Sequence, residues 1–277
     1  MSGILYVTGT PIGNLEDITL RQLRILKEVD FIAAEDTRVT RKLLTHFEIK
    51  SELVSYHEHS DMNAIERIIS RIEAGENCAI VTDAGMPCIS DPGEVLVRMC
   101  RERNISVQAV PGASAVVTAL SVCGGSTRQF VFYGFLPVEK KPRSEIIQEL
   151  KSEYRTAVLY EAPHKLTKTL SDLCENLKAS RKIALCRELT KVHEEVLRMT
   201  LEESVRYYQE HDPRGEFVLV LDGAEHQKEE ITLEDALVIA EKYLSQGLTA
   251  SAAAKMTAKD TGIPKNQIYQ AMHGNQN

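Results

Sequence analysis

The segment of residues 79–93, AIVTDAGMPCISDPG, constrains the fold of this chain more than any other stretch. It begins with a short apolar run that ends at Asp83, a pattern that predicts a buried strand. The glycines and prolines that follow predict a loop held open at the carboxyl end of that strand. Ligands of α/β sheets bind at such ends, and Gly85 would let a ligand approach the backbone.

The last residues of this segment predict the start of a helix. Asp91 would be the N-cap, Pro92 the first helical residue and Glu94 the acidic partner that closes a capping box. We therefore expect a strand, a rigid polar loop and a capped helix in direct succession.

Two further segments repeat the pattern of a strand, a glycine loop and a helix. One is a strand over 4–8 followed by the loop GTPIGN, and the other is a strand over 105–110 followed by the loop PGASA. The first loop is not the dinucleotide fingerprint GxGxxG, and the sequence has no phosphate-binding GxxxxGK[ST] motif. A single loop of this kind is usually only a tight turn, but three that converge on one edge of a sheet predict a ligand site.

Strand and helix signals alternate through the chain and predict an α/β fold whose first sheet is mostly parallel and covered on both faces. We expect an N-terminal α/β domain over 1–123, a second α/β domain over 126–225 and a small helical, helix–turn–helix-like domain over 230–277. Some strand signals of the second domain follow each other without a full helix, which predicts a mixed sheet. The predicted strands cover 4–8, 31–34, 53–56, 79–82 and 105–110, and then 130–134, 156–161, 182–188, 194–199 and 216–222.

Composition narrows the class of protein. The chain has 277 residues, 43% of them apolar and 26% charged, as expected of an ordinary globular protein. No apolar window is long enough for a membrane span and no charged leader precedes the first strand, so we expect a cytoplasmic protein. Six cysteines without a CxxC pair favour reduced thiols over disulfides or zinc, and we expect no metal. A net charge of −7 does not favour general binding of nucleic acid, so any RNA contact must come from local patches.

A series of motifs in register over residues 3–223 carries a family resemblance. They are VTGTPIGNLEDIT (7–19), AEDTR (34–38), YHEH (56–59), VTDAGMPCISDPG (81–93), VPGASAV (110–116), GFLP (134–137), YEAPHKL (160–166), RELTK (187–191) and GEFVLV (215–220). With these motifs and its helical tail, the chain resembles the tetrapyrrole methylase superfamily, and within it the branch of 16S ribosomal RNA (cytidine-2'-O)-methyltransferases.

The resemblance implies a fold of two α/β domains that bind S-adenosylmethionine in the cleft between them, plus a small C-terminal helical domain. It also implies 2'-O-methylation of a cytidine ribose in the decoding region of 16S ribosomal RNA, by a homodimer that acts on the small ribosomal subunit. Asp83 would favour the cationic sulfonium side of the cofactor. The residues that the resemblance assigns to cofactor binding are Pro11, Asp83, Ala84, Gly85, Ser114, Ala115, Tyr160, Glu161, Leu189 and Thr190.

Basic residues near strand ends are the predicted contacts to RNA. A compact basic group over 38–42 suits phosphates, although a solvated helix face accounts equally well for Arg41 and Lys42. The preceding Glu35 and Asp36 belong either to the site or to a helix start, where the dipole favours acidic residues. His57 and His59 favour a polar acceptor pocket over metal ligation. The predicted RNA contacts are Arg38, Arg41, Lys42, His57, Lys165, Arg187 and Lys191.

Methyl transfer to a ribose hydroxyl needs in-line positioning, and the hydroxyl must lose its proton. The candidate bases are Glu161, Glu188 and a Lys165 that burial makes neutral. The sequence does not choose among them, and catalysis by positioning alone stays open.

The shared fold leaves two other functions open. One is C-methylation of a tetrapyrrole ring, against which the basic groups near the cleft count without excluding it, because a porphyrinogen is polyanionic. The other is a ligand-sensing regulator whose tail reads DNA. Five lysines against six acidic residues between 228 and 277 speak against such a reader, which is usually basic.

Overall fold

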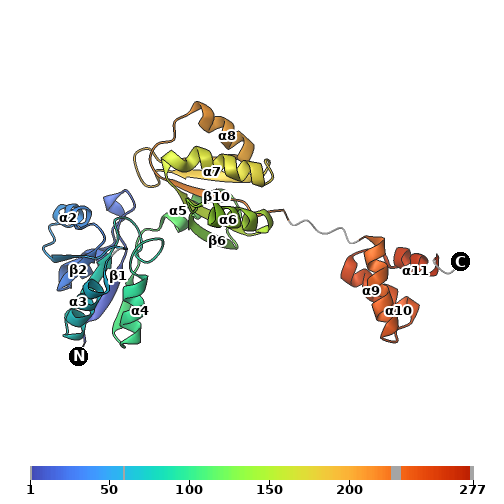
Figure 1. The fold of residues 1–277 in the computed structure, drawn as a ribbon, viewed down its shortest axis with the longest axis horizontal. Helices are drawn as coiled ribbons and strands as arrows, with labels where there is room; N and C mark the ends of the chain where they lie inside the picture. The colour runs from blue at the N-terminus through green and yellow to red at the C-terminus, as the bar shows by residue number, and fades with distance from the viewer. Residues whose placement is uncertain (1, 59, 226–231, 275–277) are drawn as a thin grey trace. The chain divides into compact units, whose positions relative to one another are not determined.

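The structure, a computed structural model, describes residues 2–58, 60–225 and 232–274. His59, which the sequence favours for a polar acceptor pocket, and the first residues of the predicted helical domain lie outside the described residues. Contacts divide the chain into two compact units, Met1–Ala224 and Glu225–Asn277 (Figure 1). The first unit holds two five-stranded sheets, and the second holds helices.

The first sheet is entirely parallel, in the strand order β3-β2-β4-β1-β5. Helices α3 and α4 cover one face, and α1 and α2 cover the other. The predicted parallel sheet with two covered faces is therefore confirmed. The elements are β1 (Ile4–Thr8), the short 3₁₀ helix η1 (Leu15–Asp17), α1 (Leu20–Glu28), β2 (Phe31–Ala34), α2 (Thr37–His46), β3 (Glu52–Ser55), α3 (Met62–Glu73), β4 (Cys78–Val81), α4 (Glu94–Glu102), β5 (Ser106–Val110) and α5 (Ala115–Val122).

The predicted cap of α4 is wrong. The helix begins at Glu94, its N-cap is Gly93 with φ 140°, and no side chain caps it. Cys88 and Ser90 have positive φ angles of 71° and 62°, so the loop turns back on itself before the helix starts. A Cβ on Gly93 would lie 2.5 Å from the Cys88 sulfur, which explains why glycine stands at this turn. Asp91 and its neighbouring proline therefore stay in the loop.

The second sheet is mixed, as predicted, in the order β6-β7-β10-β8-β9. Strands β6 and β7 are parallel, and the other pairs are antiparallel. One face packs under α6, α7 and α8, while the other packs against α5 and Ile12 of the N-terminal half. This second contact fixes the two halves of the first unit against each other. The elements are β6 (Phe130–Phe135), α6 (Lys140–Ser152), β7 (Thr156–Glu161), α7 (Pro163–Asn176), β8 (Lys182–Arg187), β9 (Glu195–Thr200), α8 (Leu201–Glu210) and β10 (Phe217–Leu221).

The tail is helical, as predicted, with α9 (Leu233–Ser245), α10 (Ala250–Thr261) and α11 (Lys265–Gly274). Alanines and Ile268 form its small buried core, so the helices approach closely. Helix α10 ends at Gly262, whose φ of 74° is the left-handed conformation that favours glycine at a helix end. Among the described residues, no helix is long and apolar enough to cross a membrane.

Candidate active site

The loops after β1 and β4 are joined by a short antiparallel bridge. The Thr10 N–H donates to the Gly85 carbonyl at 2.8 Å, and the Gly85 N–H donates to the Thr10 carbonyl at 3.1 Å. The Thr10 hydroxyl also donates to the Thr82 carbonyl at 3.1 Å. Both backbone polar groups of Gly85 thus have a partner inside the protein, and its contact with the cofactor stays a prediction.

The loop after β5 meets the loop after β1 through two glycines. A Cβ on Gly9 would lie 2.9 Å from the Gly112 Cα, and one on Gly112 would lie 3.0 Å from the Gly9 Cα. The Gln22 side-chain amide donates to the Gly9 carbonyl at 2.6 Å and fixes the contact. The three glycine loops converge as predicted, but these two glycines serve loop packing.

A cavity of about 470 Å³ opens beside the bridge between the first two loops. Its walls come from the β1 loop, η1, α2, the β4 loop and the segments around Lys191 and Glu216. It gathers five residues predicted from the sequence: Pro11, Lys42, Asp83, Ala84 and Lys191.

Asp83 carries the carboxylate at this cavity. Its Oδ1 accepts the Asp36 N–H at 3.1 Å. Loss of surrounding water raises the pKa of Asp83. The hydrogen bond from Asp36 lowers this pKa, whereas the charges of Glu35 and Asp36 raise it further. A carboxylate with a raised pKa is better suited to accept a proton near neutral pH than an ordinary one.

The Lys191 side chain lines the cavity and pairs with two carboxylates. Its Nζ lies 2.8 Å from Glu188 Oε1 and 2.9 Å from Glu216 Oε2. Burial favours a lower pKa for Lys191, but the two carboxylates outweigh it and the pKa is raised. A Cβ on Gly13 would lie 2.5 Å from the Lys191 Cγ, so the glycine makes room for this side chain.

Glu188 is held as an ion-pair partner. Burial favours a higher pKa for its carboxyl group, but the hydrogen bond and charge of Lys191 outweigh it and the pKa is lowered. Its Oε1 also accepts the Glu216 N–H at 3.0 Å. Glu188 and Thr190 have φ angles of 50° and 66°, which fix this tight turn. A carboxylate that is so well stabilised in its charged form is a weak base.

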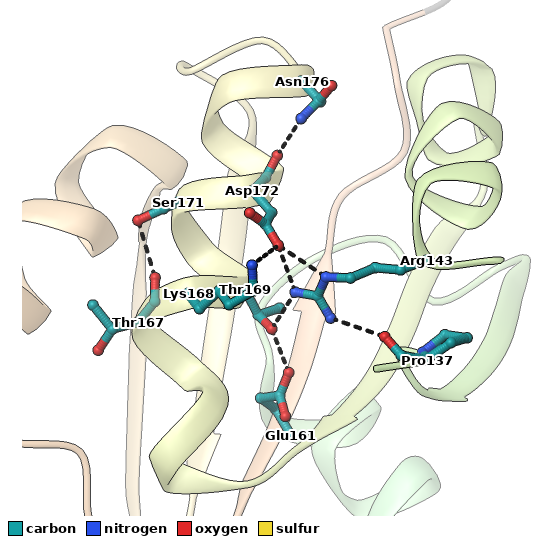
Figure 2. A network of polar contacts seen from close by, with 9 residues as sticks. All are labelled: Pro137, Arg143, Glu161, Thr167, Lys168, Thr169, Ser171, Asp172 and Asn176. Carbon is teal, nitrogen blue, oxygen red and sulfur yellow. Dashed lines mark hydrogen bonds and ion pairs between the residues drawn. The ribbon is translucent and has the colours of Figure 1, made fainter. Parts of the chain in front are cut away.

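Glu161 lies on the opposite face of its strand from the N-terminal half. Figure 2 shows its carboxylate pointing toward Thr169 of α7, whose hydroxyl donates to Oε2 at 2.5 Å. Its Oε1 accepts the Ala162 N–H at 2.8 Å. Arg143 donates to the same threonine oxygen at 2.8 Å and to Asp172 at 2.8 Å (Figure 2). With 4% of its surface exposed, Glu161 belongs to this network, and neither the catalytic nor the cofactor role suits it there.

The other predicted cofactor residues gather at the start of α5. Ser114 is the N-cap, yet its side chain makes no capping hydrogen bond, and Ala115 follows it. Tyr160 packs on Phe132 and Phe135, with ring centroids 4.9 and 5.4 Å apart. Leu189 is buried in the apolar cluster that joins the two halves.

The Thr190 side chain lies beside Gly13 of the β1 loop. Its hydroxyl oxygen is one of four buried side-chain polar atoms without a hydrogen-bond partner among the described residues. Buried hydroxyls in proteins nearly always have a partner. A Ser114 hydroxyl without a capping hydrogen bond and an orphaned Thr190 hydroxyl fit a ligand with many polar atoms.

The predicted RNA contacts are divided over several surfaces. Arg38 pairs with Asp36 at 2.6 Å, and its hydrogen bonds lower the pKa of Asp36 to about 2. Arg41 lies beside Lys50 and Glu52 in a pocket separate from the cavity. Only Lys42 and Lys191 line the cavity itself.

The remaining three lie elsewhere. Arg187 donates to the Arg214 carbonyl at 2.8 Å and lies 3.6 Å from Glu195. Lys165 is half-buried in the first turn of α7. His57 lines a second cavity of about 580 Å³ whose walls carry the carboxylates of Glu35, Glu58, Asp91 and Glu94. Such an acidic surface does not favour a phosphate.

Sequence reasoning missed several groups of this region. His46 lines the cavity one helical turn after Lys42, a spacing that could have revealed it. Burial, followed by the charge of Glu35, raises the pKa of Asp91 to about 6. The Thr82 hydroxyl donates to Glu35 at 2.5 Å, a contact that no sequence spacing signals.

Among the described residues, no cluster of three or more histidine, cysteine or acidic side chains could hold a metal ion.

Two family models match the chain. Residues 4–204 match tetrapyrrole (corrin/porphyrin) methylases, and residues 235–276 match the RsmI C-terminal HTH domain. A Synechocystis protein, ribosomal RNA small subunit methyltransferase I, is 46% identical over 97% of this chain and 96% of its own length. Proteins with the same name from Bacillus subtilis and Escherichia coli O157:H7 are 43% and 40% identical, over 98% and 97% of this chain and 94% of their own lengths.

Solved structures show a similar fold at low sequence identity. Diphthine synthase matches with a TM-score of 0.63 at 14% identity, over 79% of this chain and 90% of that one. The methyltransferase CobJ matches with a TM-score of 0.62 at 16% identity, over 80% of this chain and 95% of that one. These likenesses concern the architecture of the two sheets.

Proposed function

The chain belongs to the tetrapyrrole (corrin/porphyrin) methylase family, and from this membership we propose that it methylates the ribose 2'-oxygen of a cytidine in the decoding region of 16S ribosomal RNA. One observation carries the proposal: relatives named ribosomal RNA small subunit methyltransferase I are 40–46% identical over nearly the whole chain, tail included. The tail itself matches a domain named for that group.

S-adenosylmethionine supplies, when bound, a methyl group already activated on a sulfonium. The residues that would hold it are Ser114, Ala115 and Tyr160 at the start of α5, with Leu189 and Thr190 opposite. The Thr190 hydroxyl supports this assignment, because it is buried without a partner among the described residues, and Ser114 makes no capping hydrogen bond that would compete with a ligand.

Asp83 takes the proton of the ribose hydroxyl. It lines the cavity, and partial loss of surrounding water, with the nearby charges of Glu35 and Asp36, raises its pKa. Lys191 stays protonated between Glu188 and Glu216, and it orients groups in the cavity through its positive charge. These roles replace the candidate bases inferred from the sequence, of which Glu161 and Glu188 are held in other contacts.

The acceptor is bound within the assembled small subunit, in the cytoplasm, by an enzyme that acts as a homodimer. A local contact rather than a general RNA affinity fits the net charge of −7.

The test is transfer of labelled methyl to ribosomal RNA in small subunits and in naked form. We expect a single 2'-O-methylcytidine, recognised by resistance of its 3' linkage to alkali, and a faster reaction on subunits. Label on a base carbon or on a tetrapyrrole ring would overturn the proposal and leave the fold unaffected. Thermal stabilisation by S-adenosylmethionine tests the cofactor separately, since a ligand at 100 times its Kd stabilises by about 2.7 kcal/mol.

A further inference from the structure

The cavity beside Asp83 has an apolar lining that methyl transfer alone does not require. Pro11, Leu15, Val39 and Leu43 give it an apolar lining. Its volume of about 470 Å³ is within the range of about 300–1,000 Å³ that is usual for small-ligand sites. Leu15 and Val39 are 39% and 38% exposed, so the lining is open to a ligand from solvent.

Basic side chains line one rim of this apolar cavity. Lys42 and His46 both contribute to the wall, and both are exposed. They follow Arg38 at intervals of four residues, so the three side chains share one face of α2. Arg41, on the same helix, lines a different pocket. Of the basic side chains of α2, those of Lys42 and His46 therefore lie at the cavity.

We propose that this cavity is a subsite for one unstacked base of the RNA substrate, with the neighbouring phosphates at Lys42 and His46. The inference rests on the proposed function and adds to it how the strand is held. A base has two apolar faces that would pack against Pro11, Leu15 and Val39. Proteins that recognise structured RNA bind bases that are splayed out of the stack in this way.

The charges of the cavity favour a nucleotide over other anions. A free phosphate or a polycarboxylate that filled the cavity would lie against Asp83 and Glu216 as well as the cations. A nucleotide keeps its charge at the rim and places a neutral base inside. The second cavity, around His57, has carboxylates in its walls and lacks this division.

The test uses the full-length protein and two RNA probes. The first is unmethylated small subunits, with binding measured over a range of KCl concentrations. The second is a synthetic RNA of the decoding region with pyrrolo-cytidine at the target, whose emission rises when the base leaves the stack. Leu15→Asp and Val39→Asp place a charge in the cavity at two partly exposed positions, so one can replace the other if folding is impaired.

Both aspartate variants are expected to weaken binding to subunits about tenfold or more, because a stacked base contributes about 1–3 kcal/mol. They should also abolish the rise in emission. Lys42→Ala should reduce the slope of binding against salt by about 0.7–0.9, the value of one phosphate contact. Lys27→Ala, an exposed lysine in the last turn of α1 that does not line the cavity, is the matched control and should bind like wild type.

Wild-type binding and emission in both aspartate variants would overturn the subsite, as would tight binding of the pyrrolo-cytidine RNA without any rise in emission. These results would leave methyl transfer to the ribose standing. Conversely, absence of RNA methylation by the wild-type protein would refute the proposed function, and the binding and emission data would still decide the subsite.

Discussion

Replacing Thr169 with valine tests whether Glu161 is a structural residue. Thr169 is fully buried, and its hydroxyl donates to Glu161 at 2.5 Å while it accepts from Arg143 at 2.8 Å (Figure 2). Valine keeps the shape and removes both hydrogen bonds. Bonds to charged groups contribute about 1.5–3 kcal/mol each, and both charged partners keep other contacts, so we expect a loss of about 2–4 kcal/mol. For a unit of this size that corresponds to a melting temperature lower by about 4–16 °C.

Hydrogen exchange of peptides from β7 and α7 is the appropriate assay, because a chain of two compact units need not unfold in one step. Ser171→Ala is the control on the same helix: its hydroxyl donates to the Thr167 carbonyl at 3.0 Å in an exposed position, so stability should change by less than about 0.5 kcal/mol. Methyl transfer at a temperature where Thr169→Val is folded should stay near the wild-type rate. A large loss of rate with unchanged exchange would mean that Glu161 acts in the chemistry, and would refute the reasoning.

Three further substitutions test the loops. Asp83→Asn should lower the rate of methyl transfer by about 10²–10⁴-fold. The wild-type rate should rise with pH through the raised pKa of Asp83, and persistence of that rise in the variant would exclude Asp83 as its origin. Gly85→Ala should lower the free energy of unfolding by about 1–2 kcal/mol in thermal melts, because the φ angle of Gly85 is +87°. The rise in melting temperature caused by S-adenosylmethionine should stay the same. Loss of that rise would instead place the ligand against this residue. Asp91 has a folded-state pKa of about 6, above its ordinary 3.8, so its carboxyl group favours folding at low pH and this contribution is lost as pH rises through about 6. Asp91→Asn should therefore be more stable than wild type at pH 8 and as stable as wild type near pH 3, as measured by denaturant titrations. A variant less stable than wild type at pH 8 would contradict the raised pKa of Asp91.

Much of the fold follows from patterns that are local in the sequence. The four isoleucines Ile65, Ile68, Ile69 and Ile72 have helical spacing, and all are buried in α3. The apolar run before Asp83 becomes the central strand β4. The mixed second sheet was signalled by strands without helices between them. In each case the backbone conformation and the buried face depend on residues only a few positions apart.

The cap of α4 shows where local reasoning ends. Asp91, Pro92 and Glu94 have the right spacing for a capping box, but the backbone turn at Cys88 and Gly93 is decided by contacts within the folded loop. Gly93 lies against Cys88 and Ile80, and the capping-box spacing takes neither residue into account.

The sequence by itself determined two α/β sheets, a helical tail, three glycine loops that meet at one sheet edge and a family with methyltransferase chemistry. The tertiary structure alone decided which charged residue faces which surface. Glu161 and Tyr160 are neighbours in the chain, yet strand alternation turns one toward α7 and the other toward α5. Arg187 ends β8 and Lys191 lies in the turn after it. Only Lys191 reaches the cavity, where Gly13 from a distant loop leaves space for it. Such outcomes depend on contacts between residues far apart in the chain, and no spacing within one segment encodes them.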